Sequence, residues 1–175
     1  MCVWIYIPPL FLCYSDTVDW KKAEYLIKLG FIYNFCLFTN WPLETFSESN
    51  QLVLCILGEN PFGSTIFTLE GKMVFDRSLN VRFCNSLSET NGCNILFIAE
   101  SQLDHLSDIM QTINQRSVLT IADAPGLAEQ GIMINLIKIN DQIRFEINMK
   151  AVEHANLKIS SQLLNLAKIV NNNNE

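Results

Sequence analysis

Apolar residues recur along this chain with two periods, one typical of strands and one typical of helices. Short runs of β-favouring residues alternate with longer segments in which apolar residues recur every three or four positions. The expected strands are 51–58, 72–76, 79–84, 94–100 and 117–123, followed by a hairpin at 132–149, and the expected helices are 20–39, 61–70, 101–115 and a final one after Ser160 or Ser161. This order predicts an α/β fold.

The first helix, from Trp20 to Thr39, is dense in apolar residues on all sides. Ala23, Leu26, Ile27, Phe31, Phe35 and Phe38 recur at helical spacing, and Pro42 forbids continuation. A helix that is apolar all round is typically buried. The pattern therefore predicts a mostly buried first helix.

The hairpin "IMINLIKINDQIRFEINM" alternates apolar and polar residues on either side of a turn at Asn140 and Asp141. With a two-residue turn, Leu136 faces Phe145 and Ile134 faces Ile147 on the core side. The other side then carries the polar residues Asn135, Arg144, Glu146 and Asn148. A slip of one residue would exchange the two sides, and Asn-Asp is a weaker turn signal than Asn-Gly.

The final segment predicts a helix with Leu163, Leu166, Ala167 and Val170 inward. Together the elements predict a three-layer α/β/α sandwich with a mixed sheet and a C-terminal β-hairpin plus helix. The chain of 175 residues has the length of one domain. We expect this domain to span residues 16–175.

Residues 1–15, "MCVWIYIPPLFLCYS", are a candidate degraded export signal, because the apolar run has the length of a signal core and is too short to span a bilayer. No Lys or Arg precedes Lys21, and Pro8 and Pro9 interrupt the run, so a buried N-terminal strand stays open as the alternative. The chain carries 12 Lys and Arg against 18 Asp and Glu, with no basic residue between Lys28 and Lys72. This distribution argues against nucleic acid as a partner.

The six cysteines lie at positions 2, 13, 36, 55, 84 and 93, without a C-x-x-C pair. That spacing does not predict a zinc site, and we expect no metal and no cofactor. The stretch "GENPFGST" has the glycines of a phosphate-binding loop but has Ser64 where the lysine belongs. His105 and His154 each lie in a predicted helix, without a recognisable nucleophile motif. We therefore expect no enzymatic activity.

The polar side of the hairpin has two interpretations. Asn135, Arg144, Glu146 and Asn148 could form a structural cross-strand network, worth about 0.2 to 1 kcal/mol per pair. Alternatively, this face receives a helix, a protein partner or a small ligand.

Five stretches in order resemble the YfiR/HmsC-like family: "FIYNFCLFTNWP", "LCILGENPFG", "GCNILFIAES", "SVLTIAD...GLAEQGIMIN" and "IRFEINMKAVEHANLKISSQLLNLAKIV". The resemblance implies a periplasmic protein that represses a YfiN-type membrane diguanylate cyclase by binding its periplasmic sensor domain. It would thereby lower cyclic-di-GMP and biofilm formation, and it would meet the membrane only through this partner. We expect this protein to work as a homodimer.

The resemblance also implies a disulfide between Cys55 and Cys93. A second bridge, found in the C-terminal half of some relatives, cannot form because no cysteine follows Cys93. Cys36 and Cys84 depart from the family pattern; we expect Cys36 to be a buried free thiol and Cys84 to compete with Cys55 for Cys93. The alternative to the repressor is a small-ligand-binding sensory module of the same fold, with Arg144 holding an anionic or zwitterionic ligand.

Overall fold

A computed structural model describes residues 20–46 and 50–170 of the protein. The candidate export segment at residues 1–15 therefore lies outside the described residues. The predicted start of the domain at residue 16 lies outside them as well.

The core of the protein is one mixed sheet of eight strands, in the order β10-β8-β7-β6-β5-β2-β4-β3. Five neighbouring strands, from β7 through β6, β5 and β2 to β4, run parallel, whereas β3 and β8 run antiparallel to their neighbours β4 and β7. The strands are β2 (Gln51–Leu57), β3 (Met73–Val74), β4 (Arg77–Cys84), β5 (Ile95–Ile98), β6 (Leu119–Ala122), β7 (Ile134–Ile139), β8 (Gln142–Asn148) and β10 (Lys168–Val170).

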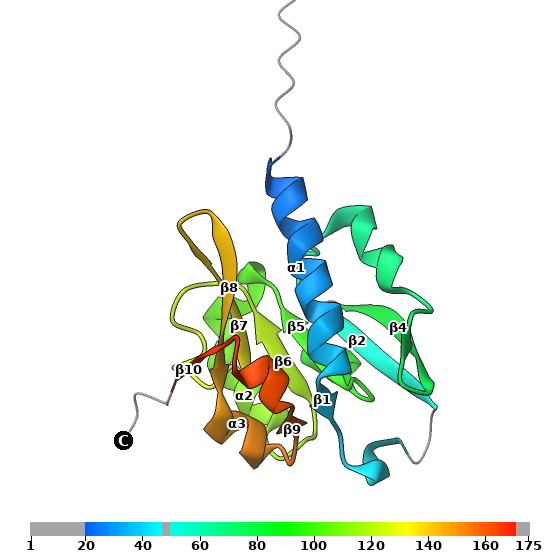
Figure 1. Cartoon of the computed structure of the whole chain (residues 1–175). Coiled ribbons are helices and arrows are strands. Elements are labelled where there is room, and N and C mark those ends of the chain that lie inside the picture. The colour runs from blue at the N-terminus through cyan, green and yellow to red at the C-terminus, as the bar shows by residue number, and fades with distance from the viewer. Residues whose placement is uncertain (1–19, 47–49, 171–175) are drawn as a thin grey trace, which may run out of the picture.

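Helices cover both faces of this sheet, so the predicted α/β/α sandwich is confirmed. Helix α1 (Trp20–Leu37) crosses one face, which it shares with the 3-10 helix η2 (Gly63–Leu69) and the short helices α3 (Met149–His154) and α4 (Ser161–Leu164) (Figure 1). Helix α2 (Leu106–Ile113) and the 3-10 helix η3 (Leu87–Thr90) lie on the opposite face. Each face has its own hydrophobic core.

Strand β2 shows how the sequence produces two cores. Its side chains alternate between the faces: Leu52, Leu54 and Ile56 enter the core below α1, whereas Val53, Cys55 and Leu57 enter the core below α2. Each of these residues is buried, as a continuous apolar run in a parallel strand predicts. The strand is hydrogen-bonded to β4 on one side and to β5 on the other.

Helix α1 differs from the prediction, because it is buried on one side only. Leu29, Ile32 and Phe35 are buried, but Leu26 and Ile27 are more than half exposed. The helix lies on the outer surface of the sheet, which can cover only the face that it contacts (Figure 1). Within the described residues, no helix is long and apolar enough to cross a membrane.

The register of the β7–β8 hairpin is the predicted one. Leu136 pairs with Phe145, and Asn135 pairs with Glu146. Asn140 and Asp141 form the two-residue turn, and both have positive φ values, 49° and 59°. Such a turn matches the twist of the flanking strands, and Asn and Asp tolerate the left-handed backbone better than most residues.

The C-terminal segment departs from the predicted long helix. Ser160 accepts a hydrogen bond from the backbone N–H of Gln162 and so begins α4, which ends at Leu164. The chain then forms β10, which pairs in parallel with β8, with Lys168 opposite Glu146. A strand is favoured here over a continued helix for two reasons. The edge of β8 that does not pair with β7 is available for a further strand, and Ile169 and Val170 are β-branched. Leu166, predicted to be buried, is exposed.

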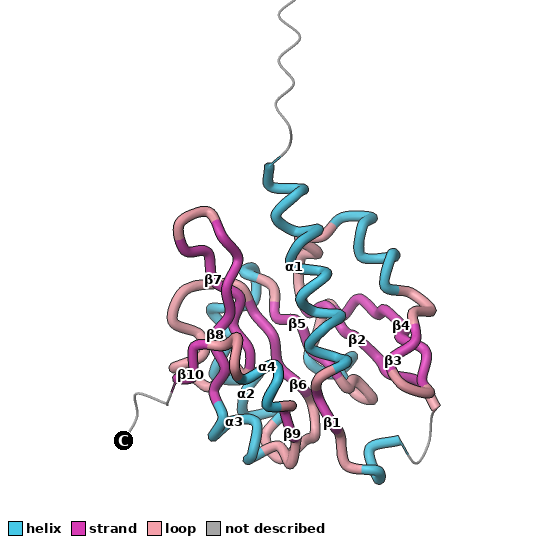
Figure 2. Tube along the Cα trace, in the orientation of Figure 1, coloured by secondary structure: helices cyan, strands magenta, loops and turns pink. Residues whose placement is uncertain are grey.

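Two shorter segments also differ from expectation. The helix after Pro61 is a 3-10 helix, and the 3-10 helix η4 (Glu100–His105) precedes α2. Ser101 does not cap this helix, because its hydroxyl accepts the backbone N–H of Glu59 (2.9 Å). Near the lower end of α1, β1 (Thr39–Asn40) pairs antiparallel with β9 (Lys158–Ile159), so the segment after α1 lies beside the segment after α3 (Figure 2).

We predict that Gly58→Ala destabilises the protein more than Gly63→Ala. Both glycines have positive φ, but an added Cβ at Gly58 would lie 2.5 Å from Ser101 Oγ, whereas at Gly63 nothing lies within 4 Å. Backbone strain alone costs about 1 kcal/mol, and the clash at Gly58 adds about 1 to 3 kcal/mol. Urea denaturation of the two variants measures the difference, and equal midpoints would contradict the prediction.

Candidate functional site

The polar side of the hairpin is largely interior. Asn135 and Asn148 are completely buried and Glu146 nearly so. Asn135 Nδ2 donates to the carbonyl of Ala124 (2.8 Å), and Glu146 Oε1 accepts from Lys168 Nζ (2.8 Å). The loop between β6 and β7 lies against this face of the hairpin, because its Ala124 and Ala128 carbonyls accept hydrogen bonds from Asn135 and Asn148. Hydrogen bonding to Glu146 raises the pKa of Lys168.

Asn148 has a structural role at the end of β8. Its side-chain oxygen accepts the backbone N–H of Ala151 (3.0 Å) and caps α3, and its Nδ2 donates to the carbonyl of Ala128 (2.7 Å). Arg144, in contrast, is exposed and donates to Gln142 Oε1 (2.7 Å). A partner or ligand face made of these residues stays a prediction, and Arg144 is the member that a partner could reach.

Cys55 and Cys93 form a disulfide with a Cα–Cα distance of 5.9 Å, which is usual for this bond. Cys55 lies in β2, and Cys93 lies just before β5, the strand that pairs with β2. The bridge closes a loop that contains β3, β4 and η3. On the chain-entropy account, a loop of this length contributes about 4 kcal/mol.

The two remaining described cysteines are free and buried. Cys36 lies in the core below α1, where burial raises the pKa of its thiol to about 12. Cys84 lies at the end of β4 in the other core, and burial raises the pKa of its thiol as well. The sulfur atoms of Cys55, Cys84 and Cys93 all lie within 4.8 Å of one another. Cys84 is therefore a neighbour of the disulfide.

A buried ion cluster fixes α1 to the sheet. Lys28 Nζ lies 2.7 Å from Glu24 Oε1, one turn earlier, and 2.8 Å from Asp123 Oδ2, which follows β6. Burial alone would lower the pKa of Lys28, but its hydrogen bonds with Asp123 and Glu24 outweigh burial and raise it. The side chains of Lys28 and Asp123 are each 7% exposed, so the Asp123 charge depends on Lys28, and the Lys28 charge depends on Asp123 and Glu24 together.

An exposed apolar stripe runs along the outer side of α1. It consists of Ala23, Leu26, Ile27 and Gly30, which are all exposed. Ala23 and Ile27 also line a groove of about 370 Å³ between α1 and the hairpin. Trp20, Lys138 and Ile143 line the rest of this groove. The ammonium group of Lys138 lies 4.8 Å from the centre of the Trp20 ring. We call Ala23, Leu26, Ile27 and Gly30 the α1 stripe.

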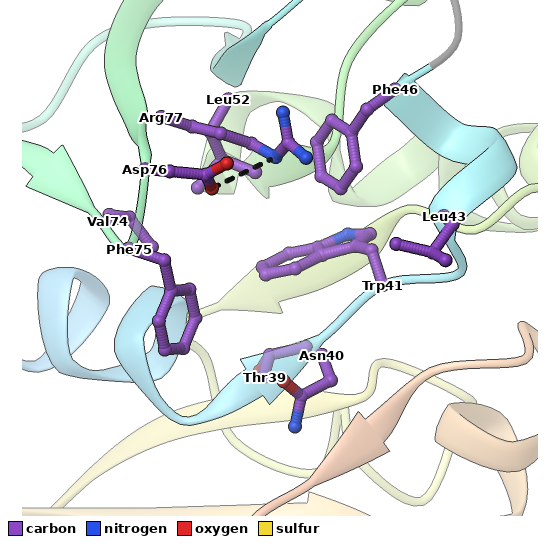
Figure 3. Close-up of a pocket in the computed structure, with 10 residues that line it drawn as sticks. All are labelled: Thr39, Asn40, Trp41, Leu43, Phe46, Leu52, Val74, Phe75, Asp76 and Arg77. Atoms are coloured by element: carbon purple, nitrogen blue, oxygen red, sulfur yellow. Dashed lines mark ion pairs between the residues drawn. The ribbon is translucent and has the colours of Figure 1, made fainter.

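A small aromatic pocket of about 150 Å³ lies near the lower end of α1 (Figure 3). Trp41 forms its floor, with Phe75 and Phe46 at its sides and Arg77 above (Figure 3). The Arg77 guanidinium lies 3.9 Å from the centre of the Phe46 ring. Trp41 Nε1 donates to the carbonyl of Asn94 (3.2 Å), which fixes the indole. A cavity of this size can hold a single ring.

The "GENPFGST" loop lies beside an acidic cleft at the carboxyl edge of the sheet. Glu59, Glu100 and Asp123 line this cleft, with Lys21 as a basic residue. Ligands of open α/β sheets commonly bind at this edge, but carboxylates repel phosphate. The lining gives no support to nucleotide binding. His154 Nε2 lies 2.8 Å from Asn114 Oδ1, and His105 is exposed.

The sequence did not predict several of these features. The sequence predicts that the residues of the α1 stripe are buried. Periodicity cannot show which side of an all-apolar helix remains exposed to solvent. The contact between Lys28 and Asp123 joins residues 95 positions apart, which no local pattern reports. The sequence predicts Asp76 only as the end of a strand and assigns no role to Arg77, although both line the aromatic pocket.

The described architecture defines the class of protein: an α/β/α sandwich with a disulfide between neighbouring parallel strands. The sequence pattern of the YfiR/HmsC-like family matches residues 25–168, so the chain belongs to this family. The resemblance drawn from the five sequence stretches is thereby confirmed. No curated protein matches the sequence at a significant level.

We predict that Asp123→Asn destabilises the protein by about 1 to 3 kcal/mol, because it removes one of the two carboxylates that pair with the buried Lys28 ammonium and leaves only Glu24. The double variant Lys28→Met/Asp123→Leu removes both charges and should recover most of this loss. Chemical denaturation measures both variants. A double variant as unstable as the single one would show that packing, rather than the lost charge pairing, causes the destabilisation.

We predict that Cys55→Ser, refolded with oxidised glutathione, forms a disulfide between Cys84 and Cys93, because their sulfur atoms lie within 4.8 Å. Two thiols give up two electrons and two protons to the oxidised glutathione. Peptide mapping without reductant identifies the bridge. Cys55→Ser/Cys84→Ser is the matched control, and free thiols at both Cys84 and Cys93 in the single variant would refute the prediction.

Proposed function

We propose that the protein is a periplasmic regulator that binds the sensor domain of a membrane-bound diguanylate cyclase and represses the enzyme. The observation that carries this proposal is the family match, which covers most of the described chain. Repression would lower cyclic-di-GMP and biofilm formation. The protein acts by binding and catalyses no reaction.

The α1 stripe supports a role in binding. Leu26 is 55% exposed and Ile27 is 53% exposed, on a helix that the buried Lys28 cluster holds rigidly against the sheet. Exposed apolar side chains on a rigid helix are suited to docking, because little conformational entropy is lost when they are covered. We assign the α1 stripe and the adjoining groove as the surface that contacts the sensor domain.

Export to the periplasm is part of the proposal. The Cys55–Cys93 disulfide supports it, since such bonds persist in oxidising compartments. We include a homodimer as the working form, and sedimentation of the purified chain tests this part separately from binding.

We predict that the full chain binds the periplasmic sensor domain of a membrane diguanylate cyclase of the same cell. The double variant Leu26→Glu/Ile27→Glu should bind at least about 30-fold more weakly, the loss expected when central apolar anchors are replaced by charges. Biolayer interferometry with the immobilised sensor domain measures this change. Cellular cyclic-di-GMP should rise when the variant replaces the wild type.

Leu166→Glu is the matched control, because Leu166 is an exposed leucine outside α1. It should bind like the wild type. Absence of binding to every such sensor domain would overturn the proposed function. Wild-type affinity in the Leu26→Glu/Ile27→Glu variant would overturn only the assignment of the surface.

A further inference from the structure

The neighbourhood of the disulfide contains three sulfur atoms from three separate segments. Cys55 belongs to β2, Cys84 ends β4, and Cys93 follows η3. Their sulfur atoms lie within 4.8 Å of one another, and all three residues are buried on the α2 side of the sheet. The Cys84 thiol donates only a weak hydrogen bond, to the carbonyl of Glu89 (3.4 Å). The three side chains therefore converge on one point.

We propose that reduction of the Cys55–Cys93 disulfide converts these three cysteines into a binding site for a thiophilic d¹⁰ cation, Zn²⁺ or Cu⁺. A dithiol reductant supplies two electrons and two protons, so that Cys55 and Cys93 become thiols while the reductant becomes a disulfide. Each cysteine that then binds the cation as a thiolate releases its proton to solvent. Oxidation by two electrons closes the site again.

The distances suit this site. Zinc binds thiolates at about 2.3 Å, so two sulfur atoms on one ion lie about 3.8 to 4.0 Å apart. The Cys84 sulfur lies within 4.8 Å of the other two and needs to approach each by less than about 1 Å, whereas the Cys55 and Cys93 sulfur atoms must separate by about 2 Å once their bond is reduced. Rotation of the side chains supplies changes of this size. Thiolates are also the ligands that select zinc and copper(I) over harder cations.

The backbone holds the three segments in place without help from the disulfide. Strand β2 pairs with β4 from Gln51 opposite Ser78 to Leu57 opposite Cys84, and it pairs with β5 on its other side. The backbone N–H of Cys93 donates to the carbonyl of Thr90 (3.2 Å), which fixes the loop before β5. The cluster therefore persists when the disulfide opens.

Two arginines place positive charge beside the cluster. Arg82 donates to the carbonyl of Asn91 (2.8 Å), and Arg116 donates to the carbonyl of Thr90. Both guanidinium groups thus bind the loop that leads to Cys93. Three thiolates on one cation leave a net negative charge in an apolar environment, and these arginines offset it. Burial and the nearby carboxylate of Glu89 raise the pKa of the Cys84 thiol, although Arg82 lowers it, and a bound cation displaces the proton.

The test uses the full chain, reduced and held without oxygen, with Zn²⁺ alone as the probe. Competition with a chromophoric chelator and native mass spectrometry should show one ion per reduced wild-type chain and none on the oxidised chain. Reduced Cys84→Ser should bind Zn²⁺ at least about 100-fold more weakly than the reduced wild type. Loss of a hydrogen-bond partner of a metal ligand already costs about 10- to 100-fold in metal affinity, and loss of the ligand itself costs more. Zn²⁺ should raise the Tm of the reduced wild type but not that of Cys84→Ser.

Cys36→Ser is the matched control, because Cys36 is buried in the core on the other side of the sheet. Its reduced form should bind Zn²⁺ like the wild type. The proposal is overturned if the reduced wild type binds no ion, if Cys84→Ser binds equally well, or if circular dichroism shows that the reduced chain is unfolded when it binds. These results do not test the proposed repression of a cyclase, because that proposal involves the α1 stripe and not the sulfur cluster.

Discussion

The parallel pairing of β2 with β4 and with β5 is the interaction on which the rest of the structure depends. It places an apolar strand at the centre of the sheet, buried on both faces, so that helices must cover both sides. It also brings Cys55 beside Cys84 and Cys93, which follow it by 29 and 38 positions along the chain. The two hydrophobic cores and the sulfur cluster are therefore consequences of the same strand pairing.

Polar interactions then fix the outer elements to this sheet. Lys28 joins α1 to the residue that follows β6, and Lys168 joins β10 to β8. The buried Lys28 cluster adds orientation more than net stability, because desolvation of the charges offsets much of their attraction. It holds α1 in one position, with the apolar stripe facing outward. Rigid presentation of that stripe is what a binding protein requires.

The distribution of exposed and buried groups separates the α1 stripe from the sulfur cluster. The α1 stripe lies on one side of the sheet, and the disulfide with Cys84 lies on the other. The polar residues of the hairpin belong neither to the α1 stripe nor to the sulfur cluster. The side chains of Asn135, Glu146 and Asn148 make hydrogen bonds within the fold. Of the four residues on the predicted polar side of the hairpin, only Arg144 is exposed.

The sequence by itself determined the α/β class, the strands of the sheet other than β10, and the register of the hairpin. These features depend on local periodicity and turn chemistry, which neighbouring residues carry. Tertiary structure alone decided which side of α1 stays exposed, that residues 168–170 form a strand, and that Cys84 lies beside the disulfide. In each case the outcome depends on which surface or strand edge remains uncovered after distant segments pack, and no local pattern contains that information.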